Sequence, residues 1–166
     1  MNVFVVSKHP RSCARALDDK RLIKMILETT QIICTVLHRR GVRGDLIPYK
    51  PTHQHHPLIE WADDADMLNW LHDLGLEYCL EFRYRFDKPH ACEDLLHQMP
   101  YIHPKHITET YCVYPHQFLN CARHGGMGLD FSHLEVREGY REYLKVRWPG
   151  DKRPPVWTRR KRPRWA

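Results

Sequence analysis

The sequence predicts a mainly α-helical protein: a compact single-domain helical bundle with long proline-rich loops and an extended basic C-terminal tail. Its 166 residues fit the length of one domain. Its composition, 42% hydrophobic and 28% charged, is typical of a globular chain. Apolar residues recur at helical spacing over long stretches, and prolines and glycines cluster between these stretches. We therefore expect a helical domain over residues 1–146 and a tail over residues 147–166.

A long helix is predicted over about residues 11–39. The stretch VFVVS that precedes it is expected to be a short extended lead, because no partner strand follows nearby. The helix is supported by apolar residues at three-to-four spacing, namely Leu22, Ile26, Ile33 and Leu37. Gly41 supplies a stop signal, and residues 41–57, with two glycines and three prolines, are expected to form a loop.

Three further helices are expected. The first runs from about Pro57 to Phe86, with an apolar face made of Leu58, Trp61, Ala65, Leu68, Leu71, Leu76 and Leu80. A shorter helix follows at about residues 90–98. Residues 99–131, with three prolines and three glycines, predict loops that contain one helical turn around residues 116–123. The last helix is expected to run from Ser132, as its N-cap, to about Val146.

Positive charge is concentrated in the C-terminal tail. The net charge is +6, and from Arg147 onward the chain carries eight Lys or Arg against one Asp. Cations release counterions from phosphates, and aromatic rings stack on unpaired bases. This mixture predicts nucleic-acid binding by Trp157, Arg159, Arg160, Lys161 and Arg162. Two alternatives stay open: the tryptophans pack back on the domain, or RRKRPR is a localisation signal.

The run DDKRLIKMILETTQ, at residues 18–31, contains one carboxylate among cations and apolar residues. On a helix, Arg21, Lys24, Glu28 and Gln31 lie within one stripe. One interpretation is a solvated face with ordinary ion pairs. The other is a functional site, because cations hold a carboxylate ionised, ready to stabilise a cationic centre or to accept a proton.

The histidine-rich loop PTHQHHP, at residues 51–57, also allows two interpretations. Three histidines in four residues suggest a metal site, but a third and fourth ligand at zinc spacing are not evident. Prolines at both ends stiffen the loop, and its Thr, Gln and His side chains suit contacts to phosphates or base edges. We expect no metal and no cofactor.

Membrane and secretory proteins are excluded by the sequence pattern. No apolar run approaches the roughly 20 residues that cross a bilayer, and the first ten residues do not resemble a secretion signal. The six cysteines show no CxxC spacing, which favours buried reduced thiols. A cytoplasmic protein without a membrane partner is the expectation.

Several motifs together resemble a known family. DDKRLIKMILETTQ, YKPTHQHHP, RYRFDKPH at residues 83–90, YREYLK and RPPVW are similar to an uncharacterised branch of the pyrimidine-dimer DNA glycosylase superfamily, of the phage endonuclease V type. The resemblance spans most of residues 1–157. It implies a small helical enzyme that cuts the N-glycosidic bond of damaged or modified bases, with residues 1–146 as the catalytic domain and DNA, or a nucleotide, as the partner.

The resemblance also implies site residues. Its characterised members use an N-terminal α-amine as nucleophile, here that of Met1 or Asn2, and a helix-borne glutamate, here Glu28. Asp19 corresponds to the acidic residue nine positions earlier. Lys24 and His56 complete the expected catalytic set, and the expected nucleic-acid contacts outside the tail are Lys20, Arg21, Thr52, His53, Arg85, Lys88 and His90.

Three other functions remain possible on the sequence alone. The first is a nucleotide- or base-modifying transferase or hydrolase on the same fold, without a Schiff base. The second is a non-catalytic nucleic-acid-binding module whose tail does the binding. The third is a metal enzyme built on the histidine loop.

Overall fold

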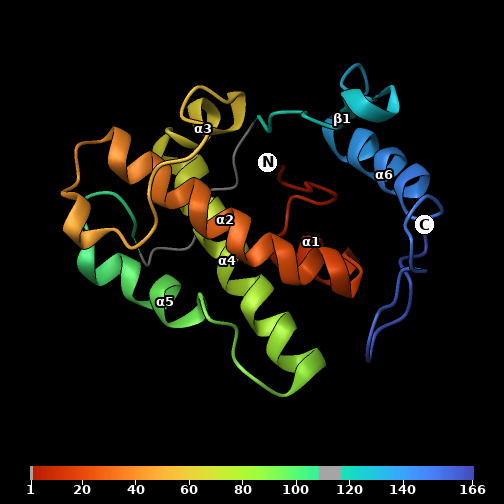
Figure 1. Ribbon diagram of the computed structural model, residues 1–166, viewed down its shortest axis with the longest axis horizontal. Coiled ribbons are helices and arrows are strands. Elements are labelled where there is room, and N and C mark those ends of the chain that lie inside the picture. The colour runs from red at the N-terminus through yellow and green to blue at the C-terminus, as the bar shows by residue number, and fades with distance from the viewer. Residues whose placement is uncertain (1, 109–116) are drawn as a thin grey trace.

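The computed structural model describes residues 2–108 and 117–166. Within these residues, 54% are helical and 3% lie in strands, and there are six α-helices (Figure 1). The predicted mainly α fold is confirmed. None of the helices in this described part has the length and apolar composition that a membrane span requires.

The predicted helix over residues 11–39 is two helices, α1 (Pro10–Ala16) and α2 (Asp19–Arg39). The chain between them is extended at Leu17, and Asp18 accepts a hydrogen bond from the backbone N–H of Arg21 as the N-cap of α2. The prediction missed this break because the apolar spacing continues across it, whereas the Asp side chain starts a new helix. The stop at Gly41 is confirmed, with a left-handed φ of +76°.

The second predicted helix is also divided, into α3 (Pro57–Ala62) and α4 (Ala65–Phe86). The cause is again an aspartate, because Asp64 accepts from the backbone N–H groups of Asp66 and Met67 at the start of α4. A short 3-10 turn, η1 (Gly44–Leu46), lies in the preceding loop.

The second half of the chain differs from the prediction in three places. Helix α5 (Glu93–Ile102) begins and ends later than expected. Of the helical turn expected at 116–123, residue 116 lies outside the described residues, and residues 117–122 are not helical. A hairpin follows instead: β1 (Arg123–His124) pairs antiparallel with β2 (Leu129–Asp130) across the 3-10 turn η2 (Gly125–Met127). Helix α6 (Val136–Arg147) is capped by Glu135 and not by Ser132.

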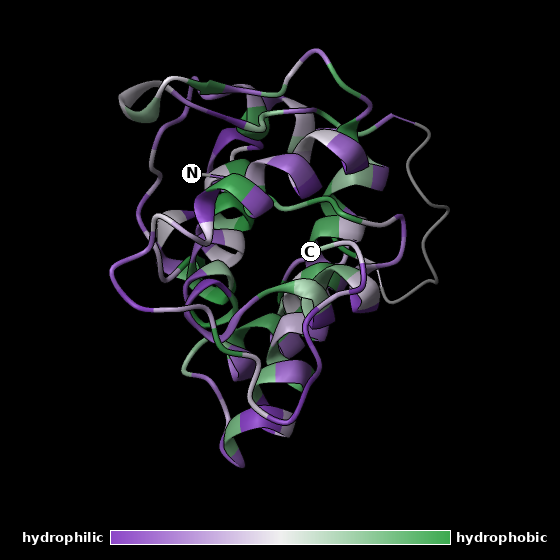
Figure 2. Ribbon diagram, turned by 90° about the vertical axis from the view of Figure 1, so that its right-hand side faces the viewer, coloured by the Kyte–Doolittle hydropathy of each residue, from purple (hydrophilic) through white to green (hydrophobic). Residues whose placement is uncertain are grey.

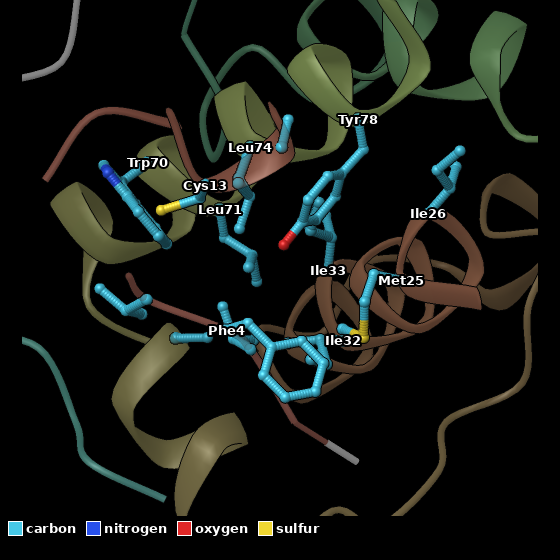
Figure 3. Close-up of a cluster of buried hydrophobic side chains, with 14 of the residues drawn as sticks. Phe4, Cys13, Met25, Ile26, Ile32, Ile33, Trp70, Leu71, Leu74 and Tyr78 are labelled. Carbon is cyan, nitrogen blue, oxygen red and sulfur yellow. The ribbon is translucent and has the colours of Figure 1, made fainter. Parts of the chain in front are cut away.

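The core forms where α2 crosses α4, with α1 packed on α4 (Figure 1). The extended lead Val3–Val6 is buried beside these helices and has no strand partner among the described residues. Figure 3 shows Phe4 of this lead on the same side of a buried cluster as Met25 and Ile32 of α2, with Leu74 and Tyr78 of α4 on the other side. The N-terminal segment is therefore fixed against α2, near the middle of the protein.

The C-terminal segment packs back on the helices. Trp148 is buried, stacks on Trp165 and meets Trp157 edge-to-face at 5.1 Å between ring centroids. The indole Nε1–H of Trp157 donates to the carbonyl of Ala16 at 3.0 Å. In Figure 2, which is coloured by hydropathy, the chain near the C-terminus passes in front of the helices in mostly hydrophilic colours. The tryptophans of the tail thus pack back on the domain, which is one of the alternatives that the sequence left open.

Candidate active site

A cavity of about 300 Å³ lies between the first half of α2, the N-terminal lead, the hairpin and α6. Its floor is apolar, since Phe4 and Met25 belong to the core as well as to the cavity lining. The described residues that line it are Asn2, Phe4, Lys20, Arg21, Lys24, Met25, Glu28, Arg123, His124, Tyr143 and Arg147. Five of them are cations, a sixth is a histidine, and Glu28 is the one carboxylate in this set.

Helix α2 packs into the core with one face and lines the cavity with the opposite face. Leu22, Ile26 and Ile33 are fully buried in the core. Arg21, Lys24 and Glu28 follow three-to-four spacing on another face and line the cavity. The predicted stripe is thus observed for these three residues, whereas Gln31 does not line the cavity.

Glu28 is largely shielded and paired with one cation. Its carboxylate Oε1 lies 2.8 Å from the Lys24 ammonium, with 17% of the Glu28 side chain and 70% of the Lys24 side chain exposed. Burial first, and then the electrostatic effects of Cys13, Tyr140 and Glu28, raise the pKa of Tyr78 well above its ordinary value. A carboxylate in this environment can stabilise a positive centre in the cavity.

Arg21 is fixed at the edge of the cavity by two carboxylates. Its Nη1 donates to Asp18 Oδ1 at 2.9 Å and to Asp151 Oδ2 at 2.8 Å, and Lys20 donates to the other oxygen of Asp151 at 3.0 Å. Burial by itself lowers the pKa of Arg21, but Asp18 and Asp151 outweigh this effect and raise it above the ordinary value. Arg21 therefore stays charged.

The opposite wall of the cavity comes from distant parts of the sequence. Arg123 and His124 lie on β1, and Tyr143 and Arg147 lie on α6. Sequence reasoning missed these four residues, because no local periodicity connects them with α2. The one local signal was a cation and a histidine directly before the glycine-rich turn at residues 125–128.

The histidine loop lies beside the second half of α2. Thr52 exchanges hydrogen bonds with Thr35, and Arg39 donates to the carbonyl of Gln54 at 2.8 Å. His56 is the N-cap of α3, where its Nδ1 accepts from the backbone of Leu58, and His53 is exposed. The cavity lining does not include Thr52, His53 or His56.

The pKa of His56 is nevertheless affected by Arg123, which lies on the hairpin that lines the cavity. Burial first, and also the charges of His53 and Arg123, lower the pKa of His56. A neutral imidazole is therefore favoured at this position. No group of three or more His, Cys, Asp or Glu side chains that could hold a metal is found among residues 2–108 and 117–166.

The expected contacts at the end of α4 do not reach the cavity. The Arg85 side chain is 0% exposed, and its guanidinium donates to Glu81, to Asp19 and to the carbonyl of Leu17. Lys88 is exposed beyond the helix, and His90 packs edge-to-face on Phe82. Arg85 is thus part of a buried ion cluster, since its charge is satisfied within the protein.

Asp19 belongs to the same buried cluster. Besides the Arg85 contact, its carboxylate accepts from the backbone N–H and the hydroxyl of Thr158, the latter at 2.7 Å. In the tail, Arg159 pairs with Asp87 and Arg160 pairs with Glu81. Arg162 lies over the rings of Trp148 and Trp157, and Lys161 is exposed.

These features define a class: a small helical protein with a cation-lined cavity that contains a shielded carboxylate, as an enzyme acting on an anionic substrate requires. A sequence profile of the pyrimidine dimer DNA glycosylase family matches residues 1–94, and the chain belongs to this family. Membership indicates a DNA glycosylase with DNA as its substrate. No curated protein and no solved structure matches the chain. The matched residues include Asn2 and Glu28, whereas the hairpin, α6 and the tail lie outside the match.

Proposed function

We propose that this protein is a DNA N-glycosylase with abasic-site lyase activity on damaged or modified bases, using the α-amine at the start of its chain and Glu28. One observation carries the proposal: Asn2 and Glu28 line the same cavity, although 26 positions separate them in the sequence. The amine belongs to Met1, or to Asn2 if Met1 is removed.

The amine attacks C1′ of the sugar and the glycosidic bond breaks, so that the base leaves with the bonding electrons and is protonated. Loss of the amine proton and ring opening give a Schiff base, and β-elimination of the 3′ phosphate then cuts the strand. Only an unprotonated amine can attack. An α-amine, with a pKa of about 7.7–8.0, meets this condition far better than a lysine at about 10.4, and the nearby charges of Arg21 and Lys24 favour the neutral form.

Glu28 stabilises the positive charge that develops at the sugar carbon and on the iminium. Its salt bridge with Lys24 fixes the position of the carboxylate, and the apolar side chains of Phe4 and Met25 line the same cavity. In this proposal Lys24 orients the carboxylate and does not attack the sugar itself.

The cations on the cavity walls bind the phosphates that flank the target nucleotide. Lys20 and Arg21 supply one wall, and Arg123 and Arg147 supply the other. A volume of about 300 Å³ lies at the lower end of the range of roughly 300–1,000 Å³ for small-ligand pockets, which suits one extruded base.

The proposal predicts a covalent adduct with DNA. Borohydride should trap the wild-type protein on a duplex that contains an abasic site, and Glu28→Gln should slow adduct formation about 100-fold or more. Glu60→Gln, a substitution of an exposed glutamate on α3, is the matched control and should leave the rate unchanged. An intact mass spectrum identifies the first residue, and reductive methylation of the α-amine should abolish the adduct.

Each other outcome has a defined meaning. Equal trapping by Glu28→Gln and the wild type would remove Glu28 from the mechanism. Base release without an adduct would indicate a hydrolase without a Schiff base. Binding without any turnover, on duplexes that carry pyrimidine dimers or abasic sites, would indicate a non-catalytic module.

A further inference from the structure

We infer that Asp151, in the C-terminal segment, is a positioning residue that holds Arg21 and Lys20 in place at the cavity. The inference rests on the proposed function, because it concerns how the phosphate-binding wall of that site is built. Asp151 lies outside the residues that match the family, 1–94. This part of the site is therefore supplied by a segment that the family match does not cover.

The local sequence explains why Asp151 is where it is. Helix α6 ends at Arg147, and the next four residues are Trp148, Pro149, Gly150 and Asp151. The backbone N–H of Asp151 donates to the carbonyl of Trp148 at 3.2 Å, which closes a four-residue turn. Proline at its second position fixes φ for such a turn. The turn directs the chain back towards the start of α2.

Asp151 contacts two cavity cations at once. One carboxylate oxygen lies 2.8 Å from Arg21 Nη1 and the other lies 3.0 Å from Lys20 Nζ, and the Asp151 side chain is 4% exposed. Because the carboxylate is shielded from water, these contacts are stronger than those of an exposed ion pair. Burial by itself raises the pKa of Asp151, but the bonds from Arg21 and Lys20 outweigh it and lower the pKa below the ordinary value.

Asp18 completes the arrangement from the other side. It caps α2 through the backbone of Arg21, accepts from Arg21 Nη1 and accepts from the indole Nε1–H of Trp148 at 2.8 Å. The Trp148 ring is thereby tied to the start of α2, and the turn that carries Asp151 is tied with it. The network thus joins two short sequence stretches, residues 18–21 and 148–151.

The charges of this network cancel, which favours a role in positioning side chains over a contribution to DNA affinity. Two carboxylates, Asp18 and Asp151, balance two cations, Lys20 and Arg21, so the network adds no net attraction for a polyanion. The hydrogen bonds from Arg21 to Asp18 and Asp151 both use Nη1, so neither of them occupies Nη2 or Nε, and Arg21 lines the cavity. Asp151 therefore fixes the direction of donors that would meet a phosphate next to the scissile sugar.

The test separates the rate of the chemical step from DNA binding. Single-turnover strand cleavage and the Kd for an abasic-site duplex are measured for the wild type, Asp151→Asn, Asp151→Glu and Asp87→Asn. Asp87→Asn is the matched control, since it removes a different tail anchor, the pair with Arg159, and neither of these residues lines the cavity. We expect Asp151→Asn to cleave roughly ten- to a hundredfold more slowly at saturating DNA, with Kd within about twofold of the wild type.

Asp151→Glu keeps the charge but displaces the carboxylate, so its rate should lie between those of the wild type and Asp151→Asn. If Asp151→Asn does not fold, the cleavage rate and the Kd of Asp151→Glu decide the question. Wild-type cleavage by both variants, or an equal loss of rate in Asp87→Asn, would overturn the inference.

A second measurement separates this inference from the proposed function. If the wild type has no cleavage activity, the proposed function fails, and the Nη1–Hη1 NMR signal of Arg21 then decides about positioning, because Nη1 is the donor to Asp151. We expect a signal protected from solvent exchange in the wild type and in Asp87→Asn, and loss of this protection in Asp151→Asn. Equal protection in all three proteins would overturn the inference.

Discussion

Arg85 and Lys24 carry the same charge, and their surroundings give them different roles. Lys24 is mostly exposed and meets Glu28 at the cavity, where a substrate phosphate or sugar can approach. Arg85 is enclosed, with Glu81 and Asp19 as partners. At the scale of single residues, burial therefore separates a charge that can meet DNA from a charge that holds the fold together.

The buried cluster around Arg85 predicts a large stability effect. Arg85→Met should lower the free energy of unfolding by about 3 kcal/mol, because it leaves two buried or half-buried carboxylates with fewer partners. Urea unfolding monitored by circular dichroism measures the change. Arg43→Gln is the control: Arg43 pairs with Asp45 at the surface, with 78% of its side chain exposed, and its replacement should cost less than about 1 kcal/mol. Equal losses in both variants would contradict the distinction.

Among the elements, α2 links the fold to the proposed chemistry. Asp18 ends the extended link after α1 and caps the start of α2. With the helix starting at this residue, Leu22 and Ile26 are buried in the core. Arg21, Lys24 and Glu28 line the cavity. The hairpin completes the cavity from the opposite side, and it depends on α6 for its position. Asn120 connects them, because its side chain donates to the carbonyls of Phe131 and Leu134 just before α6.

Gly139 of α6 should tolerate no side chain. An added Cβ would lie 2.6 Å from Asn120 Nδ2 and 2.8 Å from the carbonyl oxygen of Phe131. Alanine gains about 1 kcal/mol in helix propensity, but overpacking of this kind costs about 1–3 kcal/mol and also shifts the hairpin. We expect Gly139→Ala to lower Tm and to reduce cleavage, as measured by calorimetry and single-turnover assays.

The matched control for this prediction is Gly125→Ala, because a Cβ at Gly125 meets nothing within 4 Å. It should leave both Tm and cleavage nearly unchanged. A rise in Tm for Gly139→Ala would mean that the loop yields and that helix propensity decides.

On the scale of the whole molecule, the distribution of paired charge matters more than the net charge of +6. The tail contributes many cations, yet Arg159 and Arg160 pair with acidic residues of α4 and of the link that follows it. Arg123, by contrast, lines the cavity and forms none of the ion pairs found among the described residues. The cavity wall is therefore the stronger candidate for phosphate contacts.

This difference predicts distinct salt dependences of DNA binding. Replacing a cation that meets a phosphate reduces the slope of log K against log salt by about 0.9. We expect this reduction for Arg123→Gln and no change for Arg159→Gln, with Kd measured by fluorescence anisotropy at several salt concentrations. An equal reduction in Arg159→Gln would instead support direct DNA binding by the tail.

The sequence by itself determined the helical class, the approximate course of the helices and the shared face of Arg21, Lys24 and Glu28. These features depend on spacing of three to four residues, which is local and can be counted. The sequence also contains the signals for the two helix breaks, because Asp18 and Asp64 are N-cap residues. The prediction missed them because the apolar spacing continues across both positions.

Only the tertiary structure decided which distant segments meet. It brought the hairpin and α6 to the cavity, enclosed Arg85, and packed the tail so that Asp151 reaches Arg21. Contacts between residues more than 100 positions apart depend on how whole helices pack, and on which charges that packing removes from water. Neither the packing of whole helices nor the burial of charges can be read from the spacing of side chains along a single helix.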